Sequence, residues 1–328
     1  MKNKIECPFC DGYANLEREP KILTYRNEPY KIMQHFYRCE KCKEEFTTDE
    51  VDEFSLRQAW YQYRAKHHIP FPEEIKSIRE QYGLSASKMS EILGMGTNQY
   101  AAYERGDMPI ISNANLIRIA SNPTSFLNLI EDSEFDAPEI KSKIKRLPQR
   151  HMSLLPINIT DDVTEYTGFR RPNWRRVSNL VLHILSQSNH QYNSPLKINK
   201  VLFFIDFLAF KELGRSVTGL TYRAIQWGPV PTFYNNIYLR LDNEELAAQS
   251  AVELGDNFVI LYTPLKDSDM SLFDEVEKSL IDITVAKFKN MPTRTIVDLS
   301  HQEKAWKELE STKALINYSD YSFNLSTL

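Results

Sequence analysis

The chain contains 328 residues, of which 42% are hydrophobic and 26% are charged, and its formal net charge at pH 7 is −4. This length suffices for two or three domains, and no apolar window is long enough to span a membrane. The N-terminal sequence MKNKIECPFC lacks the apolar core of a secretory signal, so we expect a cytoplasmic protein. Because the chain is slightly acidic, any nucleic-acid site must be local.

All four cysteines lie near the N-terminus in two Cys-x-x-Cys pairs, Cys7 with Cys10 and Cys39 with Cys42. In a reducing compartment such thiols bind metal more readily than they form disulfides. Two such turns complete the tetrahedron that zinc prefers, and four Cys ligands leave no position open for water. A redox pair and two disulfides are the alternatives. We predict a zinc ribbon with one structural Zn2+ over residues 1–46, too small to fold without its metal.

A linking helix and a compact helical domain are expected after the ribbon. The linking helix is predicted over residues 47–71, where Thr47 and Glu50 form a capping box. Residues 72–131 contain five short helical segments, joined by turns that contain glycines such as Gly83. This pattern is typical of a helix-turn-helix domain, and a generic amphipathic helical domain is the alternative.

DNA contact would come from the second helix of that motif, whose N-terminal residues meet base edges in the major groove. This helix is predicted to begin at about Thr97, which is placed to reach a phosphate or a base. Asn98 and Gln99 suit base reading because an amide bonds adenine through two hydrogen bonds. Lys88 and Arg105 are candidate phosphate contacts. The domain carries only 5 Lys and Arg against 7 Asp and Glu. We therefore expect modest affinity and a homodimer, which doubles the contacts.

A change in charge marks residues 132–172, where helical periodicity fades and an acidic segment gives way to a basic one. We interpret this stretch as a linker with a basic tract. The tract is either solvated or contacts DNA phosphates. Its basic residues are Lys141, Lys143, Lys145, Arg146 and Arg150.

The largest block, residues 173–310, is predicted to be mostly helical, with strands in LTYRAIQW and NFVILYTP. The helix that Pro195 opens is apolar nearly all round, which indicates a central core helix or an aromatic face for a partner. Gly228 is expected to allow a tight exit from the first strand, and Pro231 to begin the next helix. Residues 311–328 are expected to form a C-terminal tail.

No group of residues typical of an enzyme emerges. The chain has only 10 glycines and no glycine-rich phosphate loop. His301, preceded by Ser300, is expected to cap the next helix rather than to act in catalysis. Asp206 would need a partner such as Lys200 or Arg223 if it is buried, and one carboxylate makes no acid–base pair. We therefore predict no enzymatic activity.

Paired Cys-x-x-Cys motifs, a linking helix and the sequence GTNQYAAYERGDMP follow one another in residues 1–131. This order resembles the MqsA (YgiT-type) antitoxin family. The resemblance implies that the ribbon binds toxin, and that an Asn of the recognition helix and an Arg four residues later read DNA. Asn98 matches the Asn, whereas Ala102 stands in place of the Arg, which implies a different operator sequence.

Three stretches of the C-terminal block resemble the Panacea (SocA-like) antitoxin domain: LKINKVLFFIDFLAF, YRAIQWGPVPTFYNNIY and VDLSHQEKAWKE. They follow the order of that family, although Ser300 and His301 are adjacent here, which is a small departure. The resemblance implies a toxin-neutralising domain rather than an enzyme. Plain core packing is the alternative role for its aromatic side chains, above all for Trp227. The candidate partner-binding residues are Phe203, Phe207, Trp227, Tyr234 and Tyr238.

The predicted fold is multidomain and mainly α: a four-cysteine zinc ribbon, a five-helix XRE-type helix-turn-helix, and a mostly helical Panacea domain with a small β-sheet. We expect the antitoxin of a type II toxin–antitoxin system. It would neutralise a cognate protein toxin by direct binding through its C-terminal domain and autoregulate its operon by binding operator DNA. One alternative is a DNA-binding transcriptional regulator whose C-terminal domain oligomerises or senses a ligand. The other is a proteolytic adaptor that lowers the amount of toxin.

Overall fold

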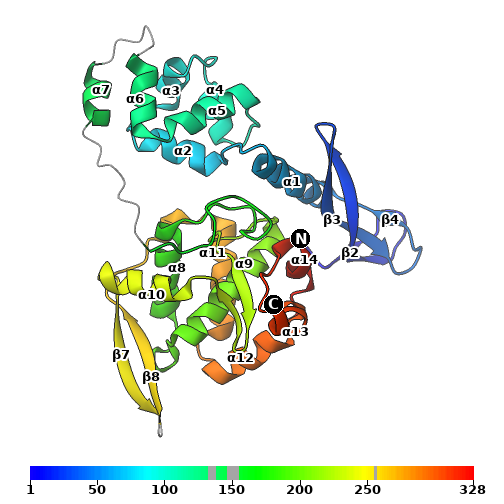
Figure 1. Cartoon of the computed structure of the whole chain (residues 1–328). Coiled ribbons are helices and arrows are strands. Elements are labelled where there is room, and N and C mark those ends of the chain that lie inside the picture. Colours follow the sequence, from blue (N-terminus) through cyan, green and yellow to red (C-terminus); the bar gives the residue numbers. More distant parts are fainter. Residues whose placement is uncertain (132–137, 146–154, 255–256) are drawn as a thin grey trace. The chain divides into compact units, whose positions relative to one another are not determined.

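The computed structural model describes most of the chain: residues 1–131, 138–145, 155–254 and 257–328. The chain divides into two compact units, one made of residues 1–62 with 154–328 and the other of residues 63–153 (Figure 1). The described residues form a mainly helical protein with a small N-terminal sheet, as predicted. None of the described helices is long and apolar enough to cross a membrane.

The N-terminal sheet has four antiparallel strands in chain order. They are β1 (Lys4–Glu6), β2 (Tyr13–Tyr25), β3 (Glu28–Cys39) and β4 (Glu45–Phe46). β2 and β3 form a long hairpin whose turn residues, Arg26 and Asn27, have positive φ angles of 49° and 64°. Such angles suit a two-residue turn that matches the twist of the strands. At the other end of the hairpin Ala14 pairs with Cys39, which brings the two cysteine-containing segments together.

Helix α1 (Asp49–Lys66) follows the ribbon, as predicted, but its start differs in detail. The backbone carbonyl of Thr48 accepts hydrogen bonds from the amides of Val51 and Asp52, so Thr48 precedes the first helical residue. The Thr47 hydroxyl donates to the Asp52 carboxylate at 2.9 Å. The predicted capping box of Thr47 and Glu50 is therefore wrong, because Glu50 pairs with the amino group of Met1 at 3.1 Å.

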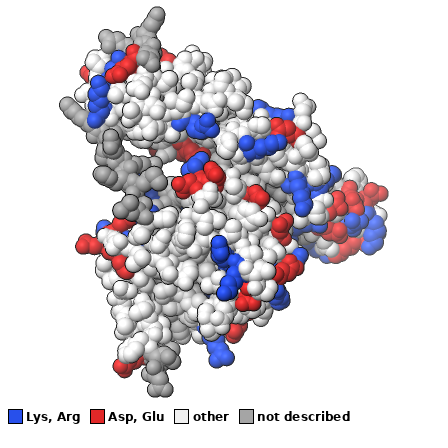
Figure 2. Space-filling model, viewed as in Figure 1, with Lys and Arg blue, Asp and Glu red and all other residues white. Residues whose placement is uncertain are grey.

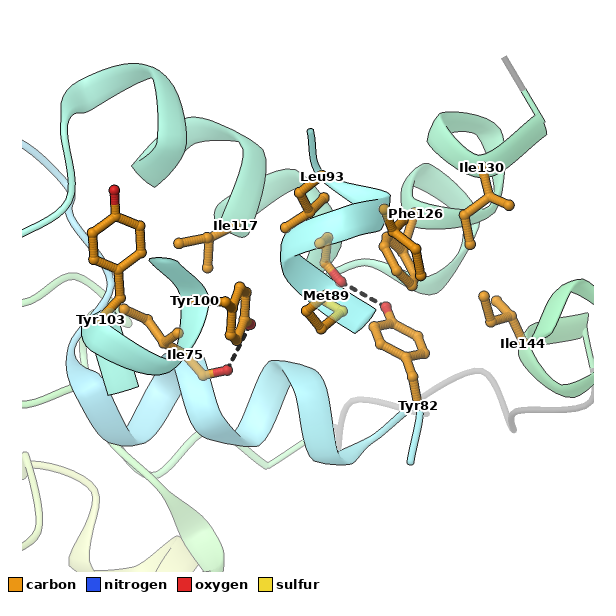
Figure 3. Close-up of a cluster of buried hydrophobic side chains, with 12 residues drawn as sticks. Ile75, Tyr82, Met89, Leu93, Tyr100, Tyr103, Ile117, Phe126, Ile130 and Ile144 are labelled. Atoms are coloured by element: carbon orange, nitrogen blue, oxygen red, sulfur yellow. Dashed lines mark hydrogen bonds between the residues drawn. The ribbon is translucent and has the colours of Figure 1, made fainter. Parts of the chain in front are cut away.

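The second unit contains the five helices expected between residues 72 and 131 and one more. They are α2 (Pro72–Glu80), α3 (Ala86–Ile92), α4 (Gln99–Glu104), α5 (Ile111–Ala120), α6 (Pro123–Glu131) and α7 (Pro138–Lys145). Their shared core is drawn in Figure 3, where the rings of Tyr82 and Phe126 lie 4.4 Å apart. The Tyr82 hydroxyl donates to the Ala120 carbonyl at 2.6 Å, so this buried polar atom is satisfied.

Helix α7 lies inside the segment that we interpreted as a linker. Ile144 is buried in the same core as Ile130 and Phe126, so α7 packs on α6. On its exposed side the Lys145 ammonium pairs with the Glu131 carboxylate at 3.3 Å. Part of the basic tract is thus a helix of the second unit, whereas residues 146–154, with Arg146 and Arg150, lie outside the described residues.

The C-terminal domain surrounds one buried helix. Its elements are α8 (Trp174–Gln187), η1 (His190–Tyr192), α9 (Pro195–Leu213), β5 (Tyr222–Ile225), β6 (Gly228–Pro231), α10 (Tyr234–Asn243), β7 (Ala247–Leu254), β8 (Asn257–Pro264), η2 (Met270–Leu272), α11 (Glu275–Phe288), α12 (Thr293–Gln302), α13 (Lys304–Leu309), η3 (Glu310–Thr312), α14 (Tyr318–Tyr321) and η4 (Ser322–Asn324). Every α9 residue from Lys197 to Phe210 is buried. The helix contacts α8, α11, α12 and α14, which is the environment expected for a helix that is apolar all round.

The sequence prediction missed two strands of this domain. The Gly-Pro-Val-Pro segment forms β6, and Pro231 pairs with Tyr222 of β5 instead of beginning a helix. A proline is tolerated here because the two-stranded sheet leaves the outer edge of β6 free of strand partners. β7 pairs with the predicted strand β8 in a second hairpin.

The predicted C-terminal tail is part of the domain core. Tyr318 is fully buried, and its ring stacks on Phe207 of α9 at 4.3 Å. The Ile316 amide donates to the Tyr222 carbonyl, which ties this segment to β5. Residues before α8 are integrated in the same way, since the buried Asn158 donates to the Gly219 carbonyl at 3.1 Å. The domain therefore extends beyond the predicted limits of residues 173 and 310.

Candidate functional site

The four cysteines converge at the open end of the β2–β3 hairpin. Their Sγ atoms all lie within 4.8 Å of one another, with Cys7–Cys42 at 3.7 Å and Cys10–Cys39 at 3.6 Å. A tetrahedral ion with Zn–S bonds of about 2.3 Å requires S···S separations of about 3.8 Å. All four are free cysteines. The arrangement therefore fits one metal ion held by four thiolates, with no open position for substrate.

Backbone groups around the cluster favour thiolates. The amides of Phe9, Gly12 and Lys41 donate to the sulfurs of Cys7, Cys10 and Cys39, each at 3.4 Å. For Cys39 the amides of Cys42 and Lys41 lower the thiol pKa to about 6. For Cys42 the opposing Glu44 amide is outweighed by burial and the neighbouring sulfurs, which raise the thiol pKa to about 12. Gly12 is required by the close approach of the two turns, because a Cβ there would lie 2.8 Å from the Lys41 Cβ. These turns hold the four sulfurs around one common point, as a single metal ion requires.

Helix α4 is held firmly on the helices that precede it. The Tyr100 hydroxyl donates to the Ile75 carbonyl at 2.8 Å, a bond drawn in Figure 3. The Tyr100 amide donates to the buried Ser90 hydroxyl at 3.0 Å. The Arg79 guanidinium binds the Glu104 carboxylate through two hydrogen bonds of 2.6 and 3.2 Å. Glu104 thus braces the helix.

The residues predicted to contact DNA lie at the two ends of α4 and on α3. Thr97, Asn98 and Arg105 are exposed, Gln99 is half-buried, and Asn98 precedes the helix with a left-handed φ of 63°. Lys88 is half-buried, and its ammonium lies 3.1 Å from the Glu91 carboxylate. The N-terminal end of α4 therefore presents the proposed base readers to solvent.

The visible face of the second unit carries no large patch of one charge among the described residues (Figure 2). On the face drawn in Figure 2, Lys and Arg side chains lie singly or beside Asp and Glu. This distribution agrees with the balance of charge counted from the sequence. DNA contact through that face would depend on a few focused groups, because its described residues form no broad basic surface.

In the C-terminal domain the turn between β5 and β6 projects one tryptophan. The side chain of Trp227 is 58% exposed. The turn beneath it is held by Trp306 of α13, whose indole N–H donates to the Ile225 carbonyl at 2.8 Å. The imidazole of His301 stacks on the Trp306 ring with centroids 3.8 Å apart. The alternative that Trp227 packs in the core is therefore wrong.

A buried lysine supports the other side of the same turn. Lys200 of α9 is fully buried, and its ammonium donates to the Pro229 carbonyl at 2.9 Å. Burial lowers the pKa of Lys200 to about 7. Gly228 has a left-handed φ of 93°, and a Cβ there would lie 2.4 Å from the Ser300 hydroxyl and 2.6 Å from Lys200 Cε. The glycine of the WGPV sequence is required by these two neighbours.

The buried carboxylate of Asp206 has other partners than the two that we predicted. Asp206 is fully buried, but it binds neither Lys200 nor Arg223. Its carboxylate accepts hydrogen bonds from the Val217 and Thr218 amides at 2.8 Å, and from the Tyr222 hydroxyl at 2.8 Å. Burial raises the pKa of Asp206 against the opposing effect of these donors. The two amides belong to the loop after α9 and Tyr222 begins β5, so Asp206 anchors this segment to the helix.

The predicted cap at Ser300 and His301 is also wrong. Both residues lie in the last turns of α12, and Glu303 occupies the position before α13. The Ser300 hydroxyl donates to the Val297 carbonyl of its own helix at 2.7 Å. Burial, and then the charge of Lys200, lower the pKa of His301. Ser300 packs against Gly228 of the β5–β6 turn, and His301 packs on Trp306, which binds that turn.

The five candidate partner-binding residues separate by exposure. Phe203 and Phe207 are fully buried, so they belong to the core and offer no surface to a partner. Tyr238 is 6% exposed, and its hydroxyl donates to the Asn199 side-chain oxygen at 2.9 Å. Tyr234 is half-buried. Trp227 is the exposed member of the set. The sequence did not predict that Lys200 and Trp306 hold the β5–β6 turn beneath Trp227. The available signal was Lys200 itself, a lysine within an apolar helix.

Comparison with known proteins finds a family match for each of two segments of the chain. Residues 5–130 match the family described as the antitoxin component of a bacterial toxin-antitoxin system, MqsA, and residues 198–307 match the family described as antitoxin SocA-like, Panacea domain. The chain is therefore similar to MqsA-type antitoxins over its first part and to the SocA-like Panacea domain over its last part. Antitoxin MqsA of Escherichia coli (strain K12) is 26% identical over 131 residues, which cover 38% of this chain and 99% of that protein. No solved structure matches the chain.

Proposed function

We propose that this protein is the antitoxin of a type II toxin–antitoxin system, with DNA binding in its MqsA-type half and toxin neutralisation in its Panacea domain. The observation that carries the proposal is the joining of two antitoxin family matches in one chain. Each matched part also exposes an element that is held in place by hydrogen bonds to its own core. This element is α4 in the first part and the β5–β6 turn with Trp227 in the second. The protein would act in the cytoplasm as a binding protein.

The DNA-binding role is supported by the N-terminal end of α4. Thr97 and Asn98 are exposed there, and the helix is braced by Tyr100 and by the Arg79–Glu104 pair. A rigid recognition helix with an exposed amide suits adenine reading in the major groove. Since the unit carries little net charge, we propose that a homodimer reads two half-sites of the operator, which would repress the protein's own operon.

Toxin neutralisation is supported by Trp227. Tryptophan is enriched among residues that dominate the free energy of protein–protein binding, especially where a large ring leaves water on contact. Its backbone is fixed before binding by Trp306 and Lys200, so little conformational entropy would be lost. We propose that the cognate toxin covers this ring and that neutralisation follows from direct contact.

The metal site supports this function indirectly. We propose that the ion is zinc, because four thiolates in a closed tetrahedron suit zinc and leave no coordination position for a reaction. Cys7, Cys10, Cys39 and Cys42 would hold it. The ion would supply folding free energy to a ribbon whose own hydrophobic core is small.

A growth-rescue experiment tests the proposal. The gene adjacent to the one that encodes this chain is expressed from an inducible promoter, with the full chain or a full-length variant supplied separately. Trp227→Ala should lose rescue, whereas Phe258→Ala, a matched control at a residue that is 70% exposed on β8, should retain it. Asn98→Ala should retain rescue but lose repression of an operon reporter.

Other outcomes identify the alternatives. If the adjacent gene is not toxic while operator binding persists, the protein is a plain transcriptional regulator. If rescue is accompanied by falling toxin levels on an immunoblot, the protein is a proteolytic adaptor. Rescue by Trp227→Ala at wild-type efficiency would contradict the assignment of toxin contact to the β5–β6 turn.

A further inference from the structure

Within the first unit, the N-terminal ribbon packs on the C-terminal domain through a buried histidine. The Gln58 side chain of α1 binds both backbone groups of Met33 on β3, each at 2.9 Å, which fixes α1 on the hairpin. His35, two residues further along β3, is fully buried. Its ring meets Phe54 of α1 at 4.8 Å and Phe323 of η4 at 5.8 Å, in both cases edge to face. Phe323 belongs to the C-terminal domain, so His35 lies between the two parts.

A second contact lies at the end of α9. Gly214 ends this helix with a left-handed φ of 73°, and a Cβ there would lie 3.2 Å from Gln58 Cγ and 3.8 Å from Tyr61 Cδ2. The guanidinium of the next residue, Arg215, lies over the Tyr61 ring at 5.5 Å. Arg215 is 7% exposed and donates to the Phe169 carbonyl at 2.8 Å, so it is anchored in the C-terminal domain. Helix α1 therefore docks on the end of α9.

The segment that presents Phe323 is held by charged groups of the C-terminal domain. The Lys211 ammonium donates to the Leu325 carbonyl at 3.1 Å. The buried Glu303 carboxylate accepts the Thr327 amide at 2.9 Å. These bonds keep the last residues of the chain in one place, with Phe323 directed to the ribbon.

Metal binding and this contact share one strand. β3 carries His35 and ends at Cys39, a candidate metal ligand four residues later. Since the ribbon has too small a core to persist without its ion, the orientation of His35 depends on the metal cluster. We propose that the metal-loaded ribbon acts as a clamp on the chain's own C-terminal segment, residues 316–328, through His35 against Phe323 and α1 against Gly214. Loss of the ion would loosen the C-terminal domain at a distance from the cysteines.

Hydrogen exchange of the full-length protein tests this clamp, with and without a zinc chelator, by mass spectrometry. Chelation should speed amide exchange at least tenfold in residues 1–46 and also in residues 316–328, while residues 82–130 of the second unit stay unchanged. Phe323→Ala should show the fast exchange of residues 316–328 with the metal bound, and chelation should add nothing there. Phe258→Ala should respond to chelation like the unmodified chain.

Two results would overturn the proposal. One is fast exchange of residues 1–46 on chelation with residues 316–328 unaffected, which would show that the contact transmits nothing. The other comes from Tyr61→Ala, which removes the Arg215 contact without touching the core around Phe323. If this variant keeps full protection of residues 210–216 and 316–328, docking of α1 has no part in holding the C-terminal segment. The readout is independent of any toxin, so failure of the proposed function would leave it intact.

Discussion

Replacing Gly228 with alanine tests whether the WGPV turn is shaped by the side chains beneath it. The new Cβ would lie 2.4 Å from the Ser300 hydroxyl and 2.6 Å from Lys200 Cε. Neither neighbour moves freely, because both are fully buried and Lys200 is bonded to the Pro229 carbonyl. We therefore expect Gly228→Ala to displace the turn and to destabilise the C-terminal domain.

The magnitude has two parts. A φ of 93° in a residue with a Cβ costs about 1–2 kcal/mol. Inserting a methyl group into a filled site costs about 1–3 kcal/mol more. The free energy of unfolding should thus fall by about 2–5 kcal/mol. Gly106→Ala is the matched control, since Gly106 has a φ of 118° and nothing within 4 Å of the position of its Cβ. This control should show the backbone part alone.

Hydrogen exchange under native conditions measures both variants in the full chain, because it reports the C-terminal domain and the second unit separately. The slowest amides of α9 give the opening free energy for Gly228→Ala, and those of α5 give it for Gly106→Ala. The lower unfolded-state entropy of alanine relative to glycine affects both variants alike and cancels in the comparison. If Gly228→Ala costs no more than Gly106→Ala, the close contacts with Lys200 and Ser300 do not shape the turn.

Three further predictions concern the N-terminal half. Cys39→Ser should lower the bound zinc measured by elemental analysis and speed exchange in residues 1–46, whereas full zinc content would contradict the four-thiolate site. Burial, and then the charge of Arg18, lower the pKa of His35 to about 4. The pKa of an unfolded histidine is about 6.5, so the unfolded chain binds the proton first as the pH falls. The contribution of neutral His35 to stability is therefore complete above pH 6.5 and is lost as the pH falls to 4. Urea unfolding should show a loss of up to about 3 kcal/mol over that range, which His35→Leu removes; an equal loss in the variant would refute the assignment. Asn98→Ala should weaken operator binding by about 1–3 kcal/mol in fluorescence anisotropy, and Ala102→Arg should strengthen it; unchanged affinity in both would exclude α4 as the reading helix.

Features that depend on local spacing could be read from the sequence. Two Cys-x-x-Cys pairs predicted a metal cluster, since four thiols on two tight turns have few other uses in a reducing environment. An all-round apolar segment between Ser194 and Gly214 predicted the buried helix α9, because such a helix must lose water on every side. The order of motifs likewise predicted both family matches.

Features that depend on residues far apart in the chain could not be read from the sequence. Trp227 is exposed because Lys200, Ser300 and Trp306, from three separate helices, already fill the space beneath its turn. The last residues of the chain are core rather than tail because Tyr318 stacks on α9 and Phe323 meets His35. Whether a side chain is buried depends on the tertiary contacts around it. Hydropathy along the chain does not specify which of several distant side chains fills a given space.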